Sequence, residues 1–242
     1  MDYRDKFYSK YISAHTARLY GEVSLIEIKK QFSTWQKYFS KFLPKDKDVK
    51  IVDLGCGNGG FVYWLQELGY SNTEGIDISI EQVEAAKKIG IKNINQGDLR
   101  DFIKNKKDSY DVIFMRDVLE HFNKEEILDI LELVYKSLKN NGTIVIQVPN
   151  AENPFGSKIY GDFTHEISFT KDSIQQIFSI SGFKDIFVYP MPRVIHGLKS
   201  LIRSILWKVI ELCLRFYFVI ETGSGKVIFT QNIIAVAKKH EL

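Results

Sequence analysis

Apolar side chains follow a helical period in the first part of this chain. In residues 18–42 the large apolar side chains recur at steps of three and four positions, as at Trp35 and Phe39, which predicts an amphipathic helix. A proline and a run of charged residues then end the helix. We therefore expect residues 1–45 to form an N-terminal helical segment in front of a main domain, residues 46–242.

From residue 50 onward the period changes, because short apolar runs alternate with helical patterns. This alternation needs crossover connections and predicts an α/β fold with a mostly parallel sheet. Runs in which apolar residues stand next to one another, such as DVIFM and TIVIQV, are typical of a sheet covered on both faces. We expect strands at residues 50–54, 73–77, 93–96, 110–115, 142–148, 183–189 and 227–237. We expect helices at residues 61–68, 80–89, 124–138, 170–181 and 195–218.

The last of these helices is expected as an insertion at about residues 193–218. At about 100° per residue, its charged side chains, among them Lys208 and Arg215, share one half of the helix, and the other half is apolar. Packing of the apolar half against the core is the ordinary outcome for such a helix. The alternative is an interfacial helix, through which residues 195–220 would contact a membrane surface or another chain.

Composition narrows the class of protein. The chain has 242 residues, of which 45% are hydrophobic and 26% charged, the balance of a globular domain. A net charge of +3 is smaller than a protein that coats nucleic acid would carry. The two cysteines make neither a zinc-binding spacing nor a disulfide framework, and the first residues lack the apolar core of a signal peptide. The cytoplasm is therefore the expected compartment.

A glycine-rich loop, DLGCGNGG at residues 53–60, follows the first predicted strand and opens a helix. Its sequence satisfies both the G-x-G-x-x-G pattern of dinucleotide-binding proteins and the pattern D-x-G-x-G-x-G. Glycine suits places where the backbone must approach a ligand closely, and the N-terminus of the helix offers N–H groups to an anion. Asp77 ends the next predicted strand, where a carboxylate can accept both hydroxyl groups of a ribose.

The D-x-G-x-G-x-G pattern resembles the cofactor motif of S-adenosylmethionine (SAM)-dependent methyltransferases. A carboxylate at residue 53 would repel a pyrophosphate but suits the positive groups of SAM, which favours SAM over a nicotinamide cofactor. The segments 97–99, 110–122 and 138–142 also resemble motifs of this family. The resemblance implies a Rossmann-like seven-stranded sheet, with helices on both faces and an antiparallel last strand. It implies that SAM is bound by Asp53, Gly55, Cys56, Gly57, Asp77, Ile78, Asp98, Leu99 and Arg116.

The methyl acceptor is expected beyond the carboxyl ends of the strands, where such sheets bind their substrates. His121 and His165 are the only histidines in the segments that follow the fourth and fifth strands. Either histidine can serve as the catalytic base near neutral pH, because a hydroxyl acceptor must lose a proton. The alternative is that His121 belongs to the start of a helix and that His165 makes a structural hydrogen bond.

The same region admits a metal-dependent interpretation. The sequence D-x-x-E-H at residues 117–121, followed by His165, is similar to a metal-binding set, E-x-x-E-H…H. That set belongs to the small-RNA 3′-end 2′-O-methyltransferases, and related sites occur in ubiquinone-pathway O-methyltransferases; a metal held there would acidify an acceptor hydroxyl. Asp117 is shorter than the glutamate that begins the set. We therefore do not favour a metal site, and a divalent metal remains the alternative cofactor.

The segments 164–170 and 195–200 look like those of methyltransferases from bacterial surface-polysaccharide pathways. This likeness implies an O-methyltransferase whose substrate is a small carbohydrate or a sugar-phosphate or sugar-nucleotide precursor. A basic cluster could bind a phosphate of such a substrate if the segment that carries it is helical. The alternative is an ordinary solvated basic face. The cluster comprises Arg193, His196, Lys199 and Arg203.

The N-terminal segment covers the cofactor as a lid in many relatives. An aromatic-rich lid would exclude water from the transfer, and simple packing against the sheet is the alternative. The residues concerned are Tyr3, Phe7, Tyr8, Tyr11 and His15.

Other functions remain as alternatives to hydroxyl methylation. The acceptor could be a phosphate or phosphoramidate oxygen, an amine or an RNA ribose, and the chain could be a SAM-binding accessory subunit without turnover. RNA is not favoured, because no basic stripe interleaved with aromatic residues is evident. The sequence makes no prediction of oligomeric state.

Overall fold

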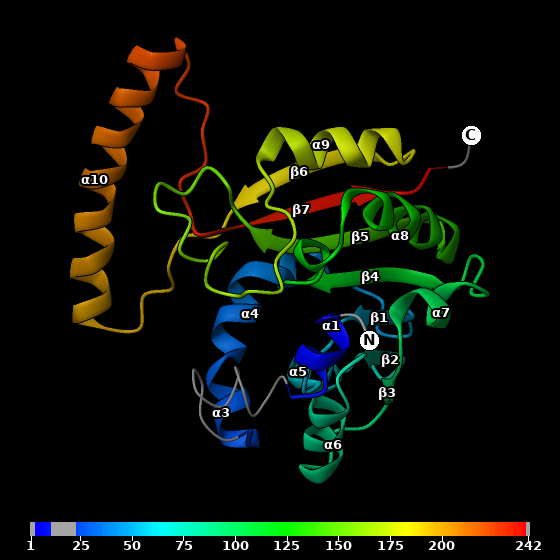
Figure 1. The fold of residues 1–242 in the computed structure, drawn as a ribbon. Coiled ribbons are helices and arrows are strands. Elements are labelled where there is room, and N and C mark those ends of the chain that lie inside the picture. The colour runs from blue at the N-terminus through cyan, green and yellow to red at the C-terminus, as the bar shows by residue number, and fades with distance from the viewer. Residues whose placement is uncertain (1–2, 11–22, 241–242) are drawn as a thin grey trace.

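The computed structural model describes residues 3–10 and 23–240, and its centre is a seven-stranded sheet (Figure 1). The strand order is β3-β2-β1-β4-β5-β7-β6, with β1 to β5 paired in parallel and β7 antiparallel to both of its neighbours. The predicted α/β fold, with an antiparallel last strand, is confirmed.

The strands and helices lie close to the predicted ranges. The strands are β1 (Ile51–Leu54), β2 (Thr73–Asp77), β3 (Ile94–Gln96), β4 (Tyr110–Arg116), β5 (Leu138–Pro149), β6 (Lys184–Pro190) and β7 (Asn232–Lys238). The first helices are α1 (Tyr3–Tyr8), α3 (Leu25–Lys30), α4 (Phe32–Phe39), η2 (Ser40–Phe42), α5 (Gly60–Glu67) and α6 (Ile80–Lys88). They are followed by α7 (Leu99–Ile103), η3 (Leu119–His121), α8 (Lys124–Ser137), α9 (Lys171–Ile180) and α10 (Leu198–Thr222).

Two buried clusters cover the two faces of the sheet. Successive strand residues point to opposite faces, so Ile113 of β4 joins one cluster and Phe114 joins the other. The Ile113 side is covered by α7, α8 and α9, and the Phe114 side by α3, α4, α5 and α6. Phe114 contacts Phe61 edge to face, with ring centroids 4.9 Å apart. The continuous apolar strands are thus explained by burial on both faces.

The N-terminal helix is interrupted where one continuous helix was predicted. Within the described part of residues 18–42, a turn at Gln31 separates α3 from α4, and a short 3-10 helix follows. The N–H group of Gln31 bonds to the carbonyl oxygen of Ile28 and so closes α3. Trp35 and Phe39 of α4 belong to the buried cluster on the Phe114 side of the sheet. This part of the segment packs on the sheet.

The last strand begins at Asn232 and not at residue 227, so the first part of the predicted strand is wrong. Side chains occupy the carbonyl groups that strand pairing would have used. The Asn150 amide donates to the carbonyl oxygens of Ile228 and Thr230, and the Asn153 amide donates to that of Phe229. These bonds hold the segment before β7 against the end of β5.

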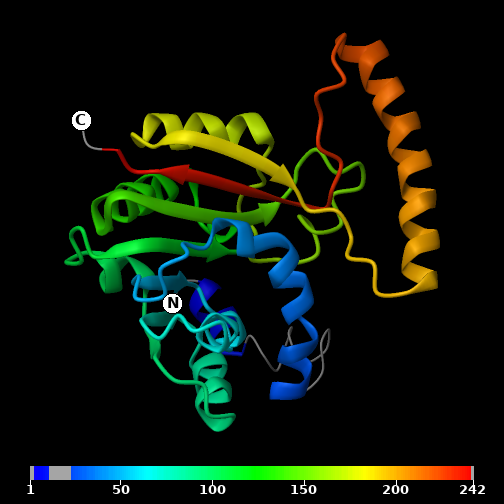
Figure 2. The same ribbon diagram turned by 180° about the vertical axis from the view of Figure 1, so that it is seen from behind.

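Helix α10 does not pack on the core. The expectation that its apolar half packs against the core is therefore wrong. None of its residues, all of which the structure describes, is buried. The helix leaves the sheet after β6 and returns to it at β7, and it stands apart from the sheet in Figures 1 and 2. The reason is that its two connections, residues 191–197 and 223–231, carry it beyond the edge of the sheet.

A buried ion pair joins β1 to β4. Asp53 is fully buried, and the Arg116 guanidinium donates a hydrogen bond of 3.1 Å to its carboxylate. The same guanidinium lies 3.9 Å from the ring centroid of Phe61. Burial raises the pKa of Asp53, and the nearby Arg116 opposes that rise. Arg116 is therefore the cation that stabilises the charged form of this buried carboxylate.

We predict that Arg116→Met lowers the free energy of unfolding by about 3–5 kcal/mol at neutral pH, because it leaves a buried carboxylate without its cation. The loss should shrink as the pH falls, since the variant's Asp53 takes up a proton. Urea unfolding measures both effects. The double variant Asp53→Asn/Arg116→Met should recover most of the loss. A loss below about 1 kcal/mol, the range of an exposed pair, would contradict the assignment.

Candidate functional site

The glycine loop after β1 is tied to the carboxyl end of β2. The N–H groups of Gly55 and Cys56 both donate to the carbonyl oxygen of Ile76, at 2.8 and 3.0 Å. The N–H group of Gly57 donates to the Asp77 carboxylate at 2.7 Å. Gly55 has a φ of +74°, and a Cβ atom there would lie 2.4 Å from the side chain of Val118. A residue larger than glycine would therefore displace the loop or the neighbouring strand end.

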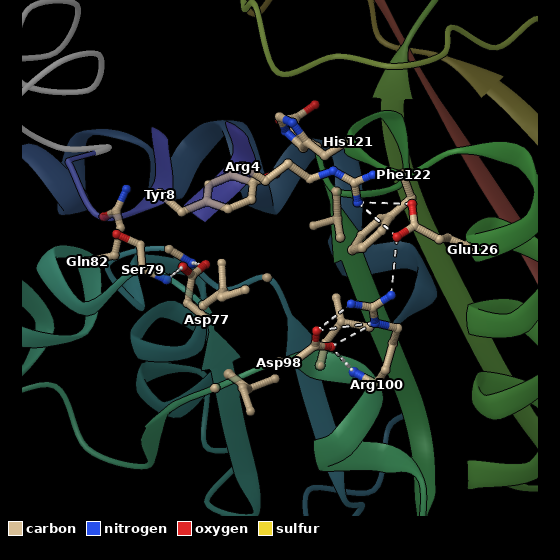
Figure 3. Close-up of a pocket in the computed structure, with 18 residues that line it drawn as sticks. Arg4, Tyr8, Asp77, Ser79, Gln82, Asp98, Arg100, His121, Phe122 and Glu126 are labelled. Atoms are coloured by element: carbon tan, nitrogen blue, oxygen red, sulfur yellow. Dashed lines mark hydrogen bonds and ion pairs between the residues drawn. The ribbon is translucent and has the colours of Figure 1, made fainter. Parts of the chain in front are cut away.

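A cavity of about 340 Å³ opens beside this loop, at the carboxyl ends of β1, β2 and β4 (Figure 3). Figure 3 shows Arg4, Tyr8 and His121 along one side of the cavity and Asp98 and Arg100 on the opposite side. Six of the nine predicted cofactor residues line it. They are Gly55, Gly57, Asp77, Ile78, Asp98 and Leu99.

The other three predicted cofactor residues lie outside the lining. Asp53 and Arg116 form the buried ion pair on the face of the sheet covered by α4 and α5. The Cys56 side chain is buried and lies against Gly75, and burial raises the pKa of its thiol well above the ordinary value. Because the Cys56 N–H group is already bonded to Ile76, its contribution is to shape the loop.

Asp77 presents a carboxylate to the cavity. One oxygen accepts the N–H group of Gly57, and the other accepts that of Ser79 at 2.9 Å. Burial raises the pKa of Asp77, and these two N–H groups oppose the rise by stabilising the charged form. Each carboxylate oxygen can accept a second bond, so the group can hold two adjacent hydroxyls.

A network of charged side chains closes the far side of the cavity (Figure 3). Arg100 donates to Asp98 through its backbone and its guanidinium, and the guanidinium also reaches Glu126 at 3.3 Å. Burial opposes charge on Asp98, but the bonds from Arg100 lower its pKa below the ordinary value. Arg4 of α1 donates two bonds, of 2.9 and 3.0 Å, to the same Glu126. The network thus joins α1 to the main domain.

Sequence reasoning missed Arg4, Arg100 and Glu126. Glu126 carried one readable signal, because Asn123 and Glu126 form the capping box at the start of α8. That signal indicates a helix start and says nothing about a cavity. Arg4 lies 122 residues from Glu126 in the sequence, so no local pattern links them.

Helix α1 brings three of the predicted lid residues to this region. Tyr8 lines the cavity, and its ring meets that of His121 edge to face at 6.2 Å. Phe7 stacks on Phe163 at 5.6 Å, and the Tyr3 hydroxyl donates to Glu166. Tyr11 and His15, the other two lid residues, lie outside the described residues.

The two predicted catalytic histidines come together although 44 positions separate them. Their ring centroids lie 4.8 Å apart, and His121 lines the cavity whereas His165 lies behind it. Thr164 donates its hydroxyl to Asp162, so its oxygen accepts the Nδ1–H of His121 at 2.9 Å. Burial, with His165 adding to the effect, lowers the pKa of His121 to about 4. His121 is therefore neutral at pH 7, with Nε2 as the nitrogen that can accept a proton.

Glu120 is fully buried beside these histidines. Among the described residues, neither of its carboxylate oxygens has a hydrogen-bond partner, and burial raises its pKa well above the ordinary value. Ligand atoms of Glu120, His121 and His165 lie within 4.8 Å of one another, a donor set that suits a transition metal. Asp117 does not join them, because Gln147 donates to its carboxylate at 2.6 Å and Asn232 at 3.3 Å. The four-residue metal set, which we did not favour from the sequence, is thus only partly assembled.

The predicted basic cluster is not helical throughout, since α10 begins at Leu198. Arg193, His196 and Arg203 nevertheless line a second cavity, of about 360 Å³. Lys199 does not line it. Arg193 and His196 lie on the segment before the helix, and Lys199 lies on a different side of the helix from Ser200, which also lines the cavity.

The fold and the cavity define a SAM-dependent methyltransferase. The glycine loop, a carboxylate at the end of β2 and an antiparallel last strand occur together in one Rossmann-like sheet. The chain belongs to the methyltransferase domain family, whose profile matches residues 28–187. The prediction that SAM is the methyl donor is confirmed by this membership, and the nicotinamide alternative is dropped.

Relatives by sequence are distant. An uncharacterised protein of Methanocaldococcus jannaschii is 29% identical over 170 residues, 68% of each chain. The ubiquinone biosynthesis O-methyltransferase of Pelagibacter ubique is 34% identical over 108 residues, 43% of each chain. Phosphoethanolamine N-methyltransferase 3 of Arabidopsis thaliana is 30% identical over 114 residues, 46% of this chain and 23% of that enzyme. The chain thus matches less than half of the length of either enzyme.

Solved structures share the fold. A SAM-dependent methyltransferase from Archaeoglobus fulgidus has a TM-score of 0.65 at 21% identity and covers 88% of this chain and 94% of its own. A phosphoethanolamine N-methyltransferase of Haemonchus contortus, bound to phosphomonomethylethanolamine and S-adenosylhomocysteine, has a TM-score of 0.61 at 14% identity. It covers 97% of this chain and 61% of its own.

We predict that Asp77→Ala weakens binding of S-adenosylhomocysteine at least about 100-fold. Two bonds from a carboxylate to ribose hydroxyls are each worth about 1.5–3 kcal/mol, and every 1.4 kcal/mol is a factor of ten. Isothermal titration measures the affinity, and circular dichroism shows whether the variant folds. Asp101→Ala is the matched control, because Asp101 is exposed on α7 and does not line the cavity. An unchanged affinity in Asp77→Ala would remove Asp77 from the ribose assignment.

Proposed function

We propose that this methyltransferase acts on a hydroxyl group of a small acceptor, with His121 as the base. One observation carries the proposal: a buried, neutral imidazole lines the cavity that the cofactor motif opens. The Pelagibacter relative, named for O-methylation, supports an oxygen acceptor. The carbohydrate or sugar-phosphate identity of that acceptor rests on sequence likeness alone and is part of this proposal.

The proposed donor site uses the six predicted residues that line the cavity. Asp77 would hold the ribose hydroxyls, and Asp98 with Leu99 would hold the adenine. SAM supplies a methyl group on a sulfonium, whose carbon–sulfur bond breaks as the acceptor's oxygen–carbon bond forms. Alignment of the two reacting atoms supplies a large part of the rate of such a displacement.

His121 would take the proton that the acceptor hydroxyl loses. The bond from its Nδ1–H to Thr164 fixes the tautomer and leaves Nε2 as the acceptor. His165 would position this ring from behind, since its own Nδ1 contacts the carbonyl oxygen of Ile159 at 2.8 Å. Asp162, Thr164 and His121 then form one hydrogen-bonded series that orients the base.

Helix α1 would act as a lid over the bound donor. Arg4 and Tyr8 line the cavity, and the bonds between Arg4 and Glu126 hold the helix in place. Exclusion of water from the reacting groups strengthens the charge interactions around them. Residues 1–45 would then have two tasks, because α4 packs on the sheet while α1 covers the cavity.

We predict that His121→Ala and His165→Ala each lower turnover about 100-fold or more, the contribution of a positioned base. A screen of sugars, sugar phosphates, phenols and amines, with release of S-adenosylhomocysteine as the readout, first identifies an acceptor. His165→Ala should leave the affinity for S-adenosylhomocysteine unchanged, because His165 does not line the cavity. His240→Ala is the control, because His240 pairs with Asp185 at the opposite edge of the sheet. Full activity in His121→Ala would refute the base assignment, and turnover of amines alone would refute a hydroxyl acceptor.

A metal-assisted transfer is the second candidate, and the unpartnered Glu120 carboxylate favours it. A metal ion held by Glu120, His121 and His165 would acidify a hydroxyl bound to it. The metal-free proposal predicts that treatment with EDTA, followed by its removal, leaves turnover unchanged. Loss of turnover on this treatment, restored by Mn²⁺ or Zn²⁺ and abolished in Glu120→Gln, would establish the metal-assisted route instead.

A further inference from the structure

Helix α10 turns its apolar side to solvent. Six large side chains recur along it at steps of three and four, and at about 100° per residue they fall within an arc of about 80°. Their exposed fractions run from 49% to 72%. They are Leu198, Ile202, Ile205, Val209, Leu212 and Phe216, which we call the apolar stripe.

The opposite side of α10 is the less exposed one. The half-buried residues Ser204, Trp207, Glu211 and Phe218 lie there, and Phe218 contacts Phe229 edge to face at 6.3 Å. A helix in water normally places its apolar side inward, so this orientation leaves a large apolar surface uncovered. Such a surface indicates a binding partner.

Cations border the apolar stripe on both sides. Lys208 flanks it on one side and Lys199 on the other, and both are exposed. Of the two acidic residues of the helix, Glu211 lies on the less exposed side and pairs with Arg215 at 3.0 Å. An apolar stripe with a cation on either side complements a surface that is apolar in its depth and negatively charged at its boundary.

We propose that α10 docks this methyltransferase on the surface of an anionic lipid bilayer. The helix would lie in the plane of the membrane, with the apolar stripe among the acyl chains and the cations beside the headgroup phosphates. Within the described residues no helix is long and apolar enough to cross a membrane, so the proposed contact is with one leaflet only. The chain's net charge of +3 has the sign that this surface attracts.

A second copy of this chain is the other occupant that we considered. Two copies paired along the apolar stripe would bring Lys199 and Lys208 of both helices to one seam, where like charges repel. Glu221, at the end of the helix, is the one acidic residue of α10 left to offset them. Charge therefore favours lipid over self-association.

The docked face would lie near the acceptor side of the enzyme. Helix α10 leaves the sheet at the end of β6 and re-enters at Asn232, which pairs with Pro149 at the carboxyl end of β5. The segment after Pro149 belongs to the same edge, and it exposes Phe155 and Tyr160. A bilayer along α10 would thus lie at the edge of the sheet from which the acceptor enters.

Vesicle sedimentation tests the proposal. The wild-type chain should sediment with vesicles of phosphatidylcholine and phosphatidylglycerol, and less with phosphatidylcholine alone or at high salt. Ile205→Asp/Val209→Asp should weaken binding to the anionic vesicles at least about tenfold, because two side chains that enter the bilayer become charged. Lys199→Gln/Lys208→Gln should weaken it about fivefold for each charge removed.

A matched double variant controls for the effect of placing a charge at an exposed apolar position. Ile26 and Ile180, exposed by 72% and 70%, lie on α3 and α9, so Ile26→Asp/Ile180→Asp should bind vesicles as the wild type does. Wild-type protein that stays in the supernatant with anionic vesicles would overturn the proposal. So would a wild-type dimer that Ile205→Asp/Val209→Asp converts to monomer with no change in vesicle binding. The assay needs no acceptor, and binding of S-adenosylhomocysteine by every variant shows separately that the donor site is intact.

Discussion

The bonds between the glycine loop and the end of β2 organise the site. Two N–H groups of the loop share the carbonyl oxygen of Ile76, and a third, from Gly57, reaches the Asp77 carboxylate. These bonds hold the loop open beside the cavity and orient Asp77 toward it. They require positive φ at Gly55 and Gly57, a conformation that residues with a side chain rarely adopt. One set of backbone bonds therefore determines both the shape of the loop and the position of the carboxylate.

The functional groups gather at one edge because the sheet is mostly parallel. The carboxyl ends of β1, β2 and β4 meet there, and the connections after β4 and β5 carry His121 and His165 to the same place. Low accessibility then changes the chemistry of these groups. It keeps His121 neutral and raises the pKa of Glu120, whose carboxylate oxygens have no hydrogen-bond partner among the described residues. The protonation states at this edge follow from burial as much as from residue type.

Several parts of the site could be recognised in advance because their signals are local. The loop at residues 53–60 needs glycine for its backbone, and Asp77 ends the strand that follows the next helix. The charged network could not be recognised, since Arg4 reaches Glu126 across 122 positions. The start of β7 was misplaced for a similar reason. Asn150 and Asn153 occupy carbonyl groups that an apolar pattern would assign to a strand.

Helix α10 shows where prediction from the sequence ends. Periodicity established that the segment is helical and that one side of it is apolar, because those features depend on neighbouring residues alone. Which way that side faces depends on the connections from β6 and to β7, and these carry the helix away from the core. The sequence thus specified the elements, the parallel sheet and the cofactor motif. The direction of the apolar side, the pairing of distant charges and the neutral state of His121 arise from packing, because each depends on residues far apart along the chain.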